Sequence, residues 1–497
     1  MLRNLKMVPA VIVAIGFAIG IAAAVPSQTT QDYADGNRLI IDGKRIFISG
    51  MNIAWNSFAH DVGDSPVDSV KLAGYFKDIK NAGGNAARWW LHTDAETCPK
   101  LNDQGQVTGI GSQTINNIRK VLDAAYEQGI VVSLTLFSFD LLQNDNNKTS
   151  TQMDRNEKFL TVPANLDTYI QNGLKPILNA VGNHPAIMCW EVFNEPEGMS
   201  SDAGGWATRK IAMSNILRFT AKIAAEVHRS TNKMASTGIH EFGKMKTWYS
   251  NAKLKTASGN DDAEAYLDFY MAHYYPEYIG TSGSPFHNPA SFWGMDRPVL
   301  IGEFPAQSWG PGTGYSSIQP NTAMTITTAY EYAYNNGYCG AMSWSITEGN
   351  KQKFGSLSTT QPALQNLYDK HKEDIRPTGT VSSSSRLSSS SRSSSSSRTA
   401  VSSSSRLQQS SSSETTTPIA VLNTAPGTKF GVRSLNNGYL LVESRENTAI
   451  HLYNINGSLV QRILIPMGSS MVKVSVPAGI YVVKNAKTGQ AQRVLVR

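Results

Sequence analysis

Residues 187–196 read IMCWEVFNEP, a mostly apolar run that ends in the polar pair Asn194 and Glu195. A near-continuous apolar run of this length is typical of a parallel β-strand buried on both faces. Residues 299–304 read VLIGEF and repeat the pattern, with Glu303 near the end. Each run therefore predicts a buried strand that delivers a glutamate to the loop that follows it.

Further apolar runs with the same character lie on either side of these two. They cover residues 46–53, 85–91, 130–137, 234–239, 268–273 and 340–346. The stretches between the runs predict helices over residues 67–82, 113–128, 166–181, 211–229 and 322–336. Strands that alternate with helices in this way predict a (β/α)₈ TIM barrel. The alternative is an open doubly wound sheet, but no glycine-rich phosphate loop follows the first strand.

The composition divides the chain of 497 residues into segments. Residues 381–413 are serine blocks separated by arginines, which cannot bury enough apolar surface to fold, so residues 379–418 are expected to be a flexible linker. The unit before the linker spans residues 25–378 and contains all of the predicted barrel strands. After it, residues 419–497 show short candidate strands at 439–442, 449–453, 471–476 and 480–483 with turn signals between them, which predicts a small all-β sandwich.

The first 24 residues have the layout of a secretory signal peptide. Arg3 and Lys6 precede an apolar stretch, and Ala22-Ala23-Ala24 offers small residues for cleavage near Ala24. A membrane anchor is the alternative, but the apolar stretch is short for a span of about 20 residues. We therefore expect a protein that is secreted or held at the cell surface, and a monomer.

The net charge of +7 does not indicate nucleic-acid binding. Residues 379–497 carry +10 and the first 24 residues carry +2, which leaves −5 for residues 25–378. A mildly acidic main unit suits a neutral substrate better than a polyanion. The three cysteines, Cys98, Cys189 and Cys339, favour buried thiols over a disulfide framework, and no Cys/His cluster has metal-site spacing, so neither a metal nor a cofactor is expected.

Glu195 and Glu303 are the candidate catalytic residues, because reactive groups of a TIM barrel gather where strands end. By order along the chain they follow strands four and seven. Cleavage of a glycosidic bond with retention needs one proton donor and one nucleophilic carboxylate about 5 Å apart. A single glutamate after a strand is as often an ion-pair partner or a helix cap, so the pair carries the prediction.

The motif WEVFNEP at residues 190–196 resembles the acid/base strand of glycoside hydrolase family 5, and IGEF at 301–304 resembles its nucleophile strand. The resemblance covers residues of about 38–372 and implies that Glu195 is the acid/base and Glu303 the nucleophile. It implies substrate-site roles for Asn194 at the sugar 2-hydroxyl, Arg88 beside the nucleophile, His273 and Tyr275 as a His-x-Tyr pair, and Trp344 beneath the central sugar.

One position departs from the family pattern. Members often carry a histidine near the end of strand three, where this chain reads FSFD at 137–140. His92, after strand two, is the candidate for comparable sugar binding. Glu191, inside strand four, is a candidate partner for other site residues rather than a catalytic group.

Within the family, the segments RWWLH at 88–92, SFDLL at 138–142 and SPFH at 284–287 resemble β-mannanases more than cellulases. The expected activity is retaining, endo-acting hydrolysis of β-1,4-linked mannan-type polysaccharide. An endo-β-1,4-glucanase is the alternative within the class, and a non-catalytic glycan-binding protein is the alternative outside it. The C-terminal run AGIYVV at 478–483 resembles type IX secretion sorting domains, which implies contact with secretion machinery or surface attachment; a carbohydrate-binding module is the rival.

Overall fold

The structure is a computed structural model that describes residues 38–377, apart from 42–43 and 145–147, and the strands that lie between residues 430 and 496. The chain divides into two compact units, and the boundary between them falls within the serine-rich segment. The expected signal peptide at 1–24 and the linker at 379–418 lie outside the described residues. Each unit is described by itself.

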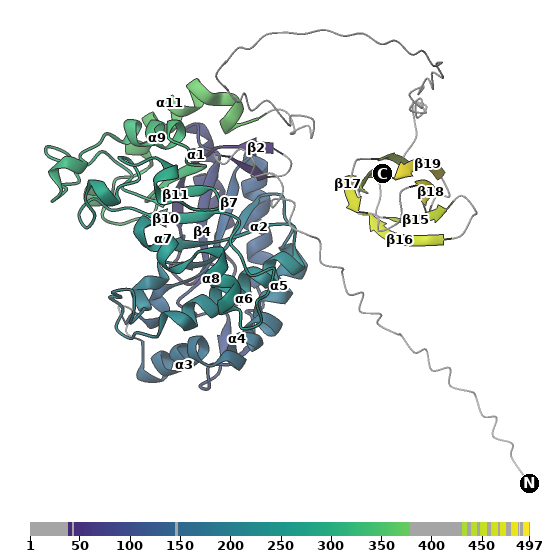
Figure 1. Ribbon diagram of the computed structural model, residues 1–497, viewed down its shortest axis with the longest axis horizontal. Coiled ribbons are helices and arrows are strands. Elements are labelled where there is room, and N and C mark those ends of the chain that lie inside the picture. Colours follow the sequence, from purple (N-terminus) through teal and green to yellow (C-terminus); the bar gives the residue numbers. More distant parts are fainter. Residues whose placement is uncertain are drawn as a thin grey trace, which may run out of the picture. The chain divides into compact units, whose positions relative to one another are not determined.

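The first unit is a closed barrel of parallel strands, with helices around it (Figure 1). The eight strands follow the closed order β10-β11-β12-β3-β4-β7-β8-β9, so the predicted TIM barrel is confirmed. Their bounds are β3 (Ile48–Ala54), β4 (Ala86–Thr93), β7 (Val131–Ser138), β8 (Ile187–Asn194), β9 (Met234–Ile239), β10 (Tyr270–His273), β11 (Val299–Glu303) and β12 (Gly340–Ser343). Each predicted strand is present, within a few residues at either end.

Helices cover the outside of the barrel. They are α1 (Ser69–Asn81), α2 (Thr114–Gln128), α3 (Ser150–Thr161), α4 (Pro163–Tyr169), α5 (Lys175–Val181), α6 (Met213–Ser230), α7 (Phe242–Trp248), α8 (Asn251–Ala257), α9 (Ile326–Asn335), α10 (Lys351–Phe354) and α11 (Leu357–Ile375). The predicted helix at 166–181 is α4 and α5 joined by a π-helical turn at Ile170–Leu174. The sequence analysis did not predict α3, α7, α8, α10 or α11.

The helices form where one apolar face can be buried against the strands. Helix α6, for example, buries Ile216, Phe219, Ile223 and Val227, which recur at the three- and four-residue spacing of one helix face. Helix α2 ends at Gly129, whose φ of +68° is the left-handed conformation that glycine adopts most readily at a helix end. The main core therefore lies between the barrel and its helices.

A second, smaller core closes the end of the barrel where the strands begin. The antiparallel hairpin of β1 (Leu39–Ile41) and β2 (Lys44–Ile46) contributes to it, together with Met188, Met271 and the thiols of Cys189 and Cys339. All three cysteines are buried and free, as the sequence analysis expected. Because this end is filled with apolar side chains, polar chemistry is left to the other end, where the strands finish.

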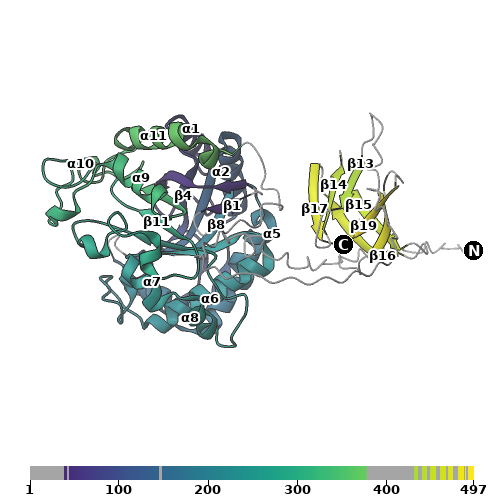
Figure 2. The ribbon, with the colours of Figure 1, turned by 45° about the horizontal axis from the view of Figure 1, so that its top comes forward.

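The C-terminal unit consists of two antiparallel sheets (Figure 2). One has the order β13-β14-β17 and the other the order β16-β15-β18-β19. Their bounds are β13 (Phe430–Ser434), β14 (Tyr439–Ser444), β15 (Thr448–Asn454), β16 (Leu459–Ile465), β17 (Gly468–Lys473), β18 (Gly479–Asn485) and β19 (Ala491–Val496). Buried side chains from both sheets, among them Val442, Leu452 and Val483, form one core, so the predicted all-β sandwich is confirmed.

Among the helices that the structure describes, none is both long enough and apolar enough to cross a membrane.

Candidate active site

Glu195 and Glu303 lie together at the end of the barrel where the strands finish. Glu303 is the last residue of β11, and Glu195 follows β8 directly. Glu195 has a left-handed φ of +43°, and its backbone N–H donates to the Gly238 carbonyl at 2.7 Å. An oxygen of each carboxylate lies within 4.8 Å of the other, with His273 beside both. The two glutamates thus have the short separation at which one carboxylate can act as a nucleophile.

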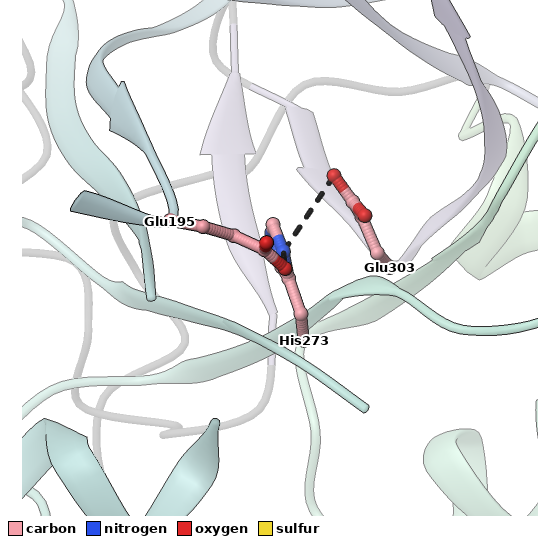
Figure 3. A group of neighbouring side chains, drawn as sticks. All are labelled: Glu195, His273 and Glu303. Carbon is pink, nitrogen blue, oxygen red and sulfur yellow. Dashed lines mark hydrogen bonds and ion pairs between the residues drawn. The ribbon is translucent and has the colours of Figure 1, made fainter. Parts of the chain in front are cut away.

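His273, the last residue of β10, lies between the two carboxylates (Figure 3). Its Nδ1 is 2.8 Å from Oε1 of Glu195 and 3.5 Å from Oε1 of Glu303. The ring is fully buried, so its orientation is fixed. His273, predicted as one member of a His-x-Tyr pair in the substrate site, therefore contacts Glu195 directly.

Arg88 connects Glu303 to the residues behind it. Its Nη1 donates to Oε1 of Glu303, and its Nη2 donates to Oδ1 of Asn194 at 2.8 Å. Nε and Nη2 of Arg88 also bind both oxygens of Glu191. All four side chains are buried or nearly so. Arg88 thus lies beside Glu303, as predicted, and Glu191 is a hydrogen-bond partner of Arg88.

Tyr275 holds the other carboxylate oxygen of Glu303. Its hydroxyl donates to Oε2 of Glu303 at 2.9 Å. Burial raises the pKa of Glu303, while the charges of His273 and Arg88 and the Tyr275 hydrogen bond favour the ionised form. Arg88 and Tyr275 together also leave the Glu303 carboxylate one orientation, in which it is aimed at the space beside Glu195.

His240 is a site residue that the sequence analysis missed. It follows β9, and its Nδ1 lies 3.5 Å from Oε1 of Glu195. Burial acts to lower the pKa of His240, but the hydrogen bond and charge of Glu195, with Glu197 and Glu241 nearby, raise it to about 9. Burial likewise acts to raise the pKa of Glu195, but His240 and His273 hold it below its usual value. The position after the predicted strand at 234–239 was the signal that could have revealed His240.

Three tryptophans form an aromatic wall on the Glu303 side of the site. Trp55 follows β3, Trp90 lies within β4 and Trp344 follows β12, and their ring centroids are 5.2 to 5.9 Å apart. The backbone N–H of Trp344 donates to the Phe304 carbonyl, next to Glu303. Trp344, predicted to lie beneath the central sugar, is thus beside Glu303, and the wall offers an apolar surface on which a sugar ring can pack.

His92 lies apart from these residues. Its ring is fully buried and packs on Phe137 and Tyr169, with centroids at 5.0 and 5.8 Å. Burial lowers the pKa of His92 to about 3, so the ring is neutral. The expected role of His92 in sugar binding is not supported, because an aromatic core surrounds the side chain.

Glu195, His273 and Glu303 also offer three atoms that could ligate a metal ion. The Arg88 guanidinium, however, contacts Glu303 directly. A fixed positive charge at this distance repels a cation. The arrangement therefore suits paired-carboxylate chemistry better than metal binding.

A TIM barrel that carries two adjacent carboxylates at the ends of strands four and seven, one held by an arginine and a tyrosine and the other by histidines, defines a glycoside hydrolase. No family model matches the chain. It is 30% identical over 347 residues to mannan endo-1,4-β-mannosidase from Cryptopygus antarcticus, which spans 64% of this chain and 84% of that protein. It is also 30% identical over 344 residues to the enzyme of the same name from Mytilus edulis, across 63% of this chain and 87% of that protein.

Solved structures agree with these relatives. The β-mannanase from the blue mussel Mytilus edulis matches with a TM-score of 0.59 at 27% identity, over 72% of this chain and all of that one. The endo-1,4-β-mannanase from Eisenia fetida matches with a TM-score of 0.57 at 28% identity, over 67% of this chain and 93% of that one. The chain belongs to the mannan endo-1,4-β-mannosidase family of glycoside hydrolases, which confirms the resemblance to the mannanases of family 5.

Proposed function

We propose that the chain is an endo-acting β-1,4-mannanase that cleaves with retention of anomeric configuration. The observation that carries the mechanism is the placement of the Glu195 and Glu303 oxygens within 4.8 Å of each other. That distance fits a direct attack by Glu303 and leaves too little room for a water molecule between a carboxylate base and the sugar.

In the first step, an oxygen of Glu303 forms a bond to the anomeric carbon as the glycosidic C–O bond breaks. Glu195 gives a proton to the departing oxygen. Glu195 and His240 form an ion pair, with 3.5 Å between Oε1 and Nδ1, that shares this proton, and the hydrogen bond with His273 fixes the Glu195 carboxylate.

In the second step, Glu195 takes a proton from water, and the water oxygen attacks the anomeric carbon. The bond to Glu303 breaks, and its carboxylate returns to the hydrogen bonds from Arg88 and Tyr275. Asn194 is held by Arg88 at 2.8 Å and by the Ser138 hydroxyl at 3.3 Å, which leaves its amide placed for the 2-hydroxyl of the reacting sugar. Mannose and glucose differ at this hydroxyl.

The choice of mannan is supported by the relatives, each of which is named a mannan endo-1,4-β-mannosidase. The experiment is a product profile on mannan, glucomannan, cellulose and mixed-linkage glucan. We expect rapid loss of viscosity and a series of oligosaccharides from the two mannan-containing substrates. Preferential cleavage of cellulose would contradict the mannan assignment and identify the protein as an endo-β-1,4-glucanase.

The mechanism has its own test. Glu303→Ala should abolish hydrolysis, and azide should restore cleavage of an activated mannoside by giving the α-mannosyl azide, since azide can enter the space of the lost carboxylate. Glu195→Ala should instead give the β-azide, because the covalent intermediate on Glu303 still forms. Full activity in Glu303→Ala would contradict the assignment.

We also propose that the protein is exported and that residues 419–497 serve in sorting or surface attachment. The signal-peptide layout of residues 1–24 and the resemblance of the C-terminal run to type IX sorting domains support this proposal. The test is to delete residues 419–497 and follow where the catalytic unit accumulates in a host that has this secretion system. Unchanged surface display would count against sorting.

A further inference from the structure

Trp206 is an exposed indole close to the acid/base. It lies in the loop between the short 3₁₀ helix Pro196–Met199 and α6, and 42% of its surface is exposed. Its ring lies 5.2 Å from the ring of Phe139 and 4.6 Å from that of His240, measured between centroids. His240 in turn contacts Glu195. This partly exposed indole therefore offers an apolar face close to the acid/base, on which a sugar ring can stack.

The loop around Trp206 holds this ring in one place. A Cβ atom on Gly198 would lie 2.8 Å from two atoms of the indole, so the ring rests directly on the Gly198 backbone. The backbone N–H groups on either side of Trp206 are also fixed: Gly205 donates to Ser200 at 3.0 Å and Ala207 donates to Gly198 at 2.8 Å. A ring that is fixed before a ligand arrives loses little conformational entropy when the ligand binds.

The closed strand order places Trp206 across the barrel from Trp344. Strands β8 and β12 are separated by three strands in both directions around the barrel, and Trp206 follows β8 whereas Trp344 follows β12. Trp344 is beside Glu303, and Trp206 is joined through His240 to Glu195. The nucleophile bonds to the sugar that is retained, and the acid protonates the oxygen of the sugar that leaves. Trp206 therefore lies on the side of the departing chain.

We propose that Trp206 is the stacking platform for a pyranose ring on the leaving-group side of the scissile bond, with Phe139 and His240 as its supports. The ligand is a β-1,4-linked hexose unit of the polysaccharide, so this proposal rests on the proposed function. The platform binds the part of the substrate that departs in the first step. It also binds an acceptor sugar that competes with water for the covalent intermediate.

The experiment compares two substrates in wild type, Trp206→Ala and Trp206→Phe. Mannopentaose needs sugars on both sides of the bond, whereas β-mannobiosyl fluoride has a fluoride leaving group with no ring to stack. We expect Trp206→Ala to lower kcat/KM on mannopentaose by about tenfold, with little change on the fluoride. Trp206→Phe keeps a smaller ring, so its kcat/KM on mannopentaose should lie between those of the wild type and Trp206→Ala. Transfer of the mannosyl group to added mannobiose, relative to hydrolysis, should decline in the same order.

Tyr126→Ala is the matched control, since Tyr126 is 56% exposed on α2, on the outside of the barrel. It should leave both substrates unchanged. An equal loss on both substrates in Trp206→Ala, or no loss on mannopentaose, overturns the platform while the proposed mannanase activity stands. Failure of the wild type to cleave either substrate overturns the proposed function and the platform together.

Discussion

Glu191 accepts two hydrogen bonds from Arg88, at 2.7 Å from Nε to Oε2 and 2.6 Å from Nη2 to Oε1, and both side chains are fully buried. The hydroxyls of Ser133 and Thr135 donate to the same Oε2 of Glu191. This pair fixes the guanidinium while its remaining nitrogen, Nη1, contacts Glu303. Glu191 is therefore a positioning residue, which acts on the nucleophile through Arg88.

Replacement of Glu191 should destabilise the barrel as well as slow catalysis. Glu191→Ala leaves the buried Arg88 charge with one of its two carboxylate partners, and removal of one member of a buried ion pair costs about 3–5 kcal/mol. Chemical denaturation of the catalytic unit measures the change in the free energy of unfolding. Glu191→Gln keeps the shape of the side chain and one acceptor oxygen, so its free energy of unfolding should fall less. A loss below about 1 kcal/mol in Glu191→Ala would contradict the role given to the pair.

Tyr275→Phe should move the acidic limb of the pH–activity profile to higher pH. Tyr275 stabilises ionised Glu303 through a 2.9 Å hydrogen bond, and Glu303 must be ionised to attack. A hydrogen bond to a charged group contributes about 1.5–3 kcal/mol, which corresponds to about one to two pH units. The pKa of Glu303 is already raised by burial, so the variant raises it further.

The measurement is kcat/KM for β-mannobiosyl fluoride as a function of pH. Because fluoride departs without strong assistance from an acid, the acidic limb reports the nucleophile rather than Glu195. An acidic limb at the same pH in wild type and Tyr275→Phe would show that Tyr275 does not control the ionisation of Glu303. Tyr126→Ala again provides a variant that should leave the profile unchanged.

The barrel could be predicted from sequence because its strands are buried on both faces, and each is a continuous apolar run such as residues 187–193. Helices α3 and α7 were missed for the opposite reason. Their apolar faces are narrow: α7 buries Phe242 and Met245 alone, which gives too weak a periodicity to stand out. Packing against the barrel, rather than a local sequence pattern, makes these segments helical.

The site was predictable where residues lie at strand ends with distinctive neighbours, as Glu195 and Glu303 do. His92 shows why position alone is insufficient. It lies on β4, four residues after Arg88, but the two side chains have different surroundings, and that of His92 enters the aromatic core. His240 was missed because its importance comes from contact with Glu195 across neighbouring strands, and such a contact leaves no local pattern in the sequence.

Removal of everything after residue 378 should leave the catalytic unit folded and active. The barrel residues bury their apolar side chains in cores of their own, and the β-sandwich has a separate core that includes Val442 and Leu452. A unit with its own core can fold alone. The expected kcat/KM on soluble mannan is within about twofold of the full chain, and the unfolding midpoint of the barrel should be unchanged. A large loss of either would show that the barrel depends on residues 379–497.

His240→Asn should move the basic limb of the pH–activity profile to lower pH. Although burial acts to lower the pKa of His240, the charges of Glu195, Glu197 and Glu241 raise it to about 9, while His273 contacts the same oxygen of Glu195. The Glu195–His240 pair therefore keeps a proton well above neutral pH. Without the imidazole, Glu195 must hold this proton alone, and a carboxyl group loses it at lower pH.

The sign of the stability change separates this role from simple packing. Because the folded-state pKa of His240 lies above its ordinary value of 6.5, the stabilisation by the pair is complete below pH 6.5 and is lost as the pH rises through about 9. Between pH 6.5 and about 9, the wild type should therefore lose stability relative to His240→Asn. Below pH 6.5, the stability curves of the two proteins should run parallel. The readouts are kcat/KM for mannopentaose against pH and the free energy of unfolding against pH. A basic limb at the same pH in both proteins, with parallel stability curves throughout, would mean that the acid proton is held by Glu195 without help from His240.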